Sequence, residues 1–77
     1  MKIQILGPGC ERCKTLAANA RKAVQELGIG ATVEKVEDAR EVARLHVLAT
    51  PALVVDGQVR SAGRVLTPEA IEGLLRG

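Results

Sequence analysis

Both cysteines of the chain, Cys10 and Cys13, lie in one Cys-x-x-Cys motif between a short apolar run and a long helical pattern. The run Ile3–Leu6 predicts a buried strand, and Gly7-Pro8-Gly9 breaks it and turns the chain. Beyond the motif, apolar residues recur at helical spacing until Gly28, which is placed to end the helix. The first unit is therefore strand, glycine-rich turn, thiol pair and helix.

The spacing of the two cysteines suits reversible redox chemistry. Cys10 and Cys13 are one helical turn apart, so they can close a disulfide with little backbone movement. A helix N-terminus beside them favours thiolate over thiol. Cys10 comes first, at the open end of the expected helix, and is the expected nucleophile. Cys13 begins the apolar stripe, so we expect it to be buried and to act as the resolving thiol.

The middle of the chain predicts a second strand and a short helix. Residues 31–36 indicate a strand, which we expect at an edge of the sheet. Asp38 followed by Glu41 is typical of an N-terminal capping box, and the helix it starts should run to about Leu45 or Val47. Because strand, helix and strand follow one another, the first two strands should form a parallel pair.

The last third predicts a hairpin and a final helix. Two strand-like runs, 52–55 and 58–62, flank Asp56-Gly57, which is the strongest short hairpin signal in a sequence. Thr67 and Pro68 predict the start of the final helix, as its cap and first residue. Its buried face should carry Ile71, Leu74 and Leu75. The predicted order is βαβαββα, an α/β fold, in one domain over residues 1–77.

Composition and charge limit the partners and the cellular location that we expect. The net charge is +2, from 11 basic and 9 acidic residues, and the chain has no Phe, Tyr or Trp. This balance argues against a nucleic-acid or membrane partner. The apolar run near the N-terminus is too short for a signal peptide, and no stretch reaches membrane-spanning length. We therefore expect a cytoplasmic location, where a Cys-x-x-Cys pair is more often reactive than structural.

Three parts of the chain together resemble a known family. Residues 7–14 around the motif, the Thr50-Pro51 step before a strand, and residues 55–58 with Gly63 downstream are similar to the thioredoxin-like superfamily. The closest likeness is to its small redox-active disulfide proteins, the minimal or archaeal-type thioredoxins, which are also glutaredoxin-like. The resemblance implies a four-stranded mixed sheet in the order 2-1-3-4, with helices on both faces.

The resemblance also implies an activity and a substrate site. An isolated X-Pro bond is usually trans, but the matching proline of this superfamily is cis and packs opposite the thiols. Thr50 and Pro51 are therefore predicted to bind substrate, with Thr50 backbone groups pairing with an extended segment. The implied function is thiol–disulfide exchange with protein or small-molecule disulfides, in a monomer recharged by a separate reductase. We expect no cofactor, because a flavin or nicotinamide site does not fit this length.

Two positions depart from the common thioredoxin pattern. Glu11 and Arg12 stand where common thioredoxins carry Gly-Pro, and such residues tune the thiol pKa and the reduction potential. Arg12 and Lys14 should favour the thiolate and Glu11 should oppose it, so the sequence does not fix the sign of their net effect. His46, the single histidine, is expected to be a partly exposed residue on or near the second helix rather than a catalyst.

A soft-metal module is the main alternative. Heavy-metal-associated domains also place Cys-x-x-Cys after a first strand, and two thiolates can hold an ion such as Cu(I). Those domains run βαββαβ and end in a strand, whereas this chain ends in the helical pattern of residues 67–76. They also carry a Met before the first cysteine, where this chain has Pro8-Gly9. A third possibility is a thioredoxin-like module that docks partners without turnover. The leading prediction assigns no metal ligand.

Overall fold

The computed structural model describes residues 1–9 and 11–76 of the chain, and the described elements follow the predicted order. None of the helices in this part is long and apolar enough to cross a membrane. The elements are β1 Lys2–Leu6, α1 Glu11–Leu27, β2 Thr32–Val36, α2 Ala39–Arg44, β3 Ala52–Val55, β4 Gln58–Ala62 and α3 Pro68–Arg76.

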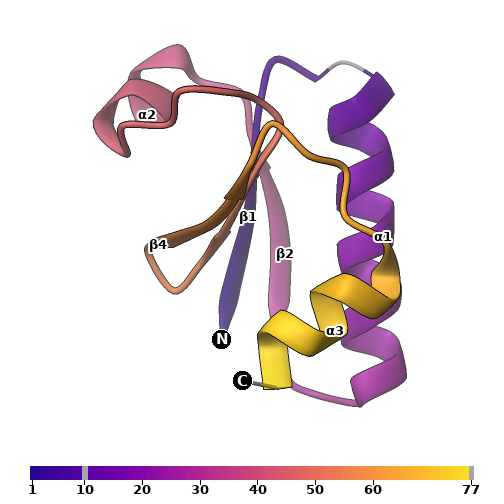
Figure 1. Ribbon diagram of the computed structural model, residues 1–77. Helices are drawn as coiled ribbons and strands as arrows, with labels where there is room; N and C mark the ends of the chain where they lie inside the picture. The colour runs from indigo at the N-terminus through magenta and orange to yellow at the C-terminus, as the bar shows by residue number, and fades with distance from the viewer. Residues whose placement is uncertain (10, 77) are drawn as a thin grey trace.

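The four strands form one mixed sheet in the order β2-β1-β3-β4. β1 pairs with β2 in parallel, and β3 pairs antiparallel with both β1 and β4. Helices α1 and α3 cover one face of the sheet, and α2 lies on the other side (Figure 1). The predicted thioredoxin-like α/β fold is therefore confirmed, including the edge position of β2 and the helices on both faces.

The two central strands are buried on both faces, as the apolar runs predicted. Side chains alternate along each strand, so each strand supplies both layers of the core. The layer under α1 and α3 contains Ile3, Ile5, Leu53 and Val55, and the layer facing α2 contains Leu6, Ala52 and Val54.

Helix α1 packs against the sheet through a narrow stripe of small side chains. Leu16, Ala17, Ala20 and Ala23 are at most 1% exposed. Leu16 and Ala17 lie four and three residues before Ala20, and Ala23 lies three residues after it, which is the spacing of one helix face. The helix ends at Gly28 as predicted, where φ is +64° and the Gly28 N–H donates to the carbonyl of Val24.

The hairpin turn and the start of the last helix also lie where the sequence predicted them. Asp56 and Gly57 have φ of +48° and +84°, and a positive φ at both central residues is the pattern of a type I′ turn. Thr67 caps α3, because its Oγ1 accepts a hydrogen bond from Ala70 N at 3.2 Å. Within α3, Ile71 is fully buried, while Leu74 and Leu75 are half-buried.

Helix α2 is shorter than predicted. Asp38 is its N-cap and accepts from Arg40 N, but the Glu41 carboxylate does not complete a capping box and instead accepts from Arg44 at 2.6 Å. The helix ends at Arg44 because His46 takes a positive φ of +57°, which turns the chain away from the helical path. His46 is exposed just beyond α2, in keeping with the expectation for this residue.

A pair of carboxyl groups joins α1 and α3. A hydrogen bond with Glu26 raises the pKa of Glu72, and burial and the charge of Glu26 act in the same direction, while Arg76 opposes them. The Glu72 side chain is 15% exposed. A carboxyl group whose pKa is raised in the folded state stabilises the fold fully below its ordinary value, 4.5, and this contribution is lost as pH rises through the raised pKa.

Glu72→Gln should therefore raise the melting temperature near neutral pH, because the amide keeps a hydrogen bond to Glu26 without a second charge. The gain should shrink as the pH falls to the ordinary carboxyl range, where the wild-type group is protonated. Thermal unfolding followed by circular dichroism across this range measures the difference. Glu69→Gln is the matched control on the same helix and should give a smaller gain. An equal gain at acidic and neutral pH would contradict the account.

Candidate functional site

The second cysteine of the motif lies at the start of α1, against the sheet. Cys13 is in the first turn of the helix, two residues after Glu11, and is 2% exposed. The predicted burial of Cys13 is thus what the structure shows. Cys10 lies outside the described residues, so its role as the nucleophile stays a prediction.

Gly7 provides the space that the Cys13 sulfur occupies. Gly7 follows β1, is itself buried, and has no side chain toward Cys13. A Cβ atom at this position would collide with Cys13 Sγ and would lie 3.7 Å from Thr50 Cβ. Gly7 therefore lies between the motif helix and the segment that precedes β3. The absence of a Cβ atom here is what allows the two to approach.

The peptide bond between Thr50 and Pro51 is cis, as the resemblance led us to expect. Pro51 is fully buried directly before β3, and its carbonyl accepts a hydrogen bond from Gly63 N at 2.9 Å. Thr50 is half-buried and lies near Gly7. The structure thus brings the Thr50–Pro51 segment to the same end of the sheet as Cys13. The binding of substrate by these residues stays a prediction.

Arg12 connects the motif to the loop after β4. Its Nη2 donates to the Gly63 carbonyl at 2.9 Å. Gly63 has φ of +76°, and a Cβ atom there would lie 3.0 Å from Ala49 Cβ, so this position suits glycine for two reasons. Through Gly63, Arg12 is linked to the carbonyl of Pro51.

The other charged residues in and beside the motif, Glu11 and Lys14, are exposed to solvent. Glu11 is 94% exposed and pairs at 4.0 Å with Lys14, which is 60% exposed. An exposed pair at this distance is weak and screened by salt. Of the two residues between the cysteines, Arg12 thus has a defined structural partner and Glu11 has a loose one. Their predicted tuning of the thiols is not tested by this geometry.

A groove runs beside the motif and brings in a residue that the sequence did not single out. It has a volume of about 290 Å³ and is walled by Gly7, Pro8 and Thr50 on one side and by α2 on the other. Glu37 also lines it, and its Oε2 lies 3.0 Å from where a Cβ of Gly9 would be. No local pattern marks Glu37, because it reaches the motif only through the pairing of β1 with β2.

The order of the elements differs from that of the metal-binding alternative. After the β4 strand the described chain continues into α3, whereas heavy-metal-associated domains end in a strand. Within residues 1–9 and 11–76, no three or more His, Cys, Asp or Glu side chains gather in a way that could hold a metal ion. The element order does not favour the alternative.

Comparison with known proteins identifies the family. Residues 1–76 match the thioredoxin domain family model. A thioredoxin of Methanothermobacter thermautotrophicus is 45% identical over 75 residues, which cover 97% of both chains. A thioredoxin of Methanocaldococcus jannaschii is 38% identical over 74 residues, which cover 96% of this chain and 85% of that protein. The chain belongs to the thioredoxin domain family, and within the thioredoxin-like superfamily it is a small redox protein.

Proposed function

We propose that this chain is a thiol–disulfide oxidoreductase that exchanges a Cys10–Cys13 dithiol with the disulfides of proteins or small molecules. The observation that carries the proposal is the burial of Cys13 at the start of α1, beside Gly7 and the cis Thr50–Pro51 segment, in a chain of this family. The metal-binding alternative is not favoured, because both relatives reported above are thioredoxins.

The exchange takes place in two substitutions at sulfur. The Cys10 thiolate attacks one sulfur of the substrate disulfide, whose S–S bond breaks and releases one substrate thiolate. Cys13 then gives up its proton and attacks the Cys10 sulfur of the mixed disulfide. The second substrate thiolate leaves, and the Cys10–Cys13 bond forms. In total the chain gives the substrate two electrons and the one proton of Cys13, and solvent supplies the second proton of the two substrate thiols, because Cys10 reacts as the thiolate.

Burial of Cys13 directs this sequence. A thiol that is 2% exposed cannot reach a bulky disulfide in solution, but it can attack a sulfur on its own chain. The free N–H groups and the dipole at the start of α1 favour the thiolate form of a cysteine that precedes the helix. Cys10 is in that position in the sequence. The division of roles follows from exposure and helix position together.

The groove beside the motif is the proposed substrate path. Thr50 and Pro8 line it beside Gly7, which adjoins Cys13, and an extended substrate segment pairs there with the Thr50 backbone. Arg12, held by the Gly63 carbonyl, and Glu11 adjust the thiols by their charge. We further propose one domain over residues 1–77, acting as a cytoplasmic monomer in electron transport to disulfide substrates, with a separate reductase as donor and without cofactor, nucleic-acid or membrane partners.

A reductase-free assay tests this function. The chain should accelerate the reduction of a protein disulfide by dithiothreitol. A thiol at a helix start is more acidic than an ordinary thiol, so more of it is thiolate and it exchanges faster than the reagent alone. Cleavage of the substrate disulfide is measured by thiol release. The matched control is the same protein after iodoacetamide treatment in the reduced state, which should lose the acceleration. Equal rates with the untreated and the alkylated folded protein would overturn the proposal.

A further inference from the structure

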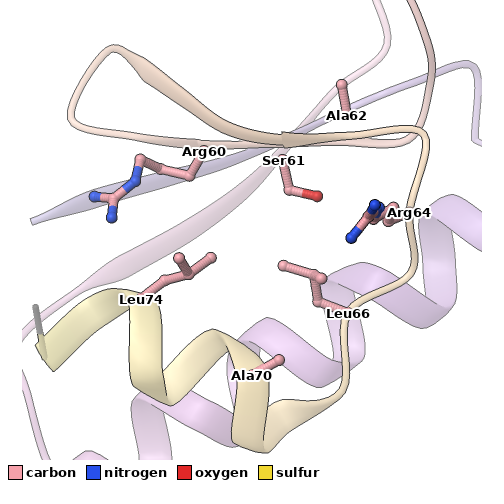
Figure 2. A pocket seen from close by; sticks show the side chains of 7 residues that line it. All are labelled: Arg60, Ser61, Ala62, Arg64, Leu66, Ala70 and Leu74. Carbon is pink, nitrogen blue, oxygen red and sulfur yellow. The ribbon is translucent and has the colours of Figure 1, made fainter.

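A second cavity lies between β4 and α3, formed by parts of the chain that the redox chemistry does not use. Its volume is about 360 Å³. Its apolar side consists of Leu66, Ala70 and Leu74, and its polar side carries Arg60, Ser61 and Arg64 (Figure 2). The lining contains no acidic residue.

An irregularity in β4 shapes the polar side. Ser61 pairs with Leu53 and Val59 pairs with Val54, so Arg60 is an extra residue in this ladder. Neighbouring residues of a regular strand point to opposite faces, whereas a β-bulge re-aims the side chains around the extra residue. The bulge therefore accounts for how Arg60 and Ser61, although adjacent in sequence, both line the same cavity.

The hydroxyl of Ser61 is in an unusual state. Among the described residues, it is the buried side-chain oxygen or nitrogen that has no hydrogen-bond partner. Buried polar groups are nearly always paired, so the lack of a partner for this hydroxyl needs a structural explanation. Figure 2 shows the hydroxyl turned along the cavity toward Arg64.

Within the described residues, Arg60 and Arg64 are also without acidic partners. No ion pair within residues 1–9 and 11–76 involves Arg60 or Arg64, although other basic residues such as Arg44 and Arg76 have carboxylate partners. A guanidinium group presents several donors in a plane, which matches the oxygens of carboxylate or phosphate. Arg64 lies on the side toward which the Ser61 hydroxyl turns, whereas the Arg60 side chain extends along β4 away from that hydroxyl (Figure 2).

From these contacts we propose that the cavity between β4 and α3 binds a small amphiphilic anion. Its carboxylate or phosphate group is held by Arg64 and the Ser61 hydroxyl, and Arg60 adds positive charge at the other end of the cavity. A short apolar chain lies on Leu66, Ala70 and Leu74. A pocket of this volume with an apolar floor and a few convergent donors is typical of a small-molecule site.

The test is a titration of the full-length protein followed by ¹H–¹⁵N correlation spectra. Hexanoate and hexyl phosphate are the two anionic probes, and their relative affinity distinguishes a carboxylate from a phosphate site. Hexylammonium has the same apolar chain with the opposite charge, and inorganic phosphate has the charge without the chain. We expect saturable shifts at Ser61, Arg64 and Ala70 with at least one anionic amphiphile, and none with hexylammonium.

Variants separate a built site from general charge attraction. Arg64→Gln should weaken binding by at least about fivefold, because it removes a charge-assisted contact. Arg40→Gln, on α2 across the sheet, removes the same charge and should leave the affinity within about twofold. Ser61→Ala should weaken binding but raise the melting temperature of the ligand-free protein, since it removes an unpaired buried hydroxyl.

Three results would overturn the proposal. One is the absence of a saturable shift at the cavity with either anionic amphiphile. Another is equal binding of hexylammonium, which would reduce the site to an apolar surface. The last is equal weakening by Arg40→Gln and Arg64→Gln, which would reduce it to net charge. The thiols take no part in any of these measurements, so the outcome is independent of the redox function.

Discussion

Cys13→Ser is expected to stop after the first exchange and to accumulate a mixed disulfide between Cys10 and the substrate. The variant keeps the proposed nucleophile but lacks the buried thiol that would release it. A serine hydroxyl does not attack a disulfide under these conditions, so turnover should fall to the uncatalysed rate. Cys10→Ser should show the same loss of turnover but should form no mixed disulfide, because Cys13 is inaccessible to the substrate.

Non-reducing electrophoresis and mass spectrometry of the intact adduct distinguish the two variants. Each serves as the control of the other, since both lose one sulfur from the same motif. The covalent adduct should disappear on addition of reductant. An adduct with Cys10→Ser, or multiple turnovers with Cys13→Ser, would reverse the assigned roles of the two cysteines.

Gly7→Ala is expected to lower both the stability and the rate of the second exchange. The added methyl group would collide with Cys13 Sγ, so the Cys13 side chain, β1 or the start of α1 must shift. Inserting a methyl group into a packed interior typically lowers the free energy of unfolding by about 1–3 kcal/mol. In a domain of this size, each kcal/mol lost lowers the melting temperature by about 4–8 °C.

Urea unfolding measures the first effect, and the rate at which the Cys10–Cys13 disulfide closes measures the second. Gly30→Ala is the matched control: among the described residues, no atom lies within 4 Å of its Cβ position, and its φ is not in the left-handed region. The control should keep wild-type closure kinetics. If Gly7→Ala and Gly30→Ala behaved alike in both measurements, the proposed close approach at Gly7 would be wrong.

Local patterns in the sequence account for most of the fold. The apolar runs of β1 and β3, the alanine stripe of α1 and the Asp56-Gly57 turn each act over a few residues, and each appears in the structure as predicted. Thr67 likewise caps α3. Errors were confined to element ends, such as α2, where the left-handed conformation of His46 ends the helix at Arg44, before the predicted end at about Leu45 or Val47.

The site depends more on contacts between distant parts of the chain. Arg12 and Gly63, which are 51 positions apart, meet only because the loop after β4 returns to the start of α1. The carboxylate of Glu37 reaches Gly9 through strand pairing, and Gly7 gains its importance from the Cys13 sulfur. The sequence therefore indicated which residues have reactive groups, but not which neighbours support them.

The same limit applies to the cavity beneath β4. Arg60 and Ser61 are adjacent in sequence, so strand alternation alone would place them on opposite faces. The bulge that brings both to the cavity depends on the register between β3 and β4. A register shift within a ladder leaves no reliable signal in a four-residue or five-residue strand.

The most direct measurement of the central claim is an equilibrium titration of the two thiols against glutathione buffers, with quantitative alkylation and mass spectrometry. The account predicts that Cys10 and Cys13 lose their alkylation together, as one two-electron couple, and that the oxidised chain carries an internal bond with no added glutathione. Independent oxidation of the two thiols, with glutathione attached and no bond between them, would contradict it.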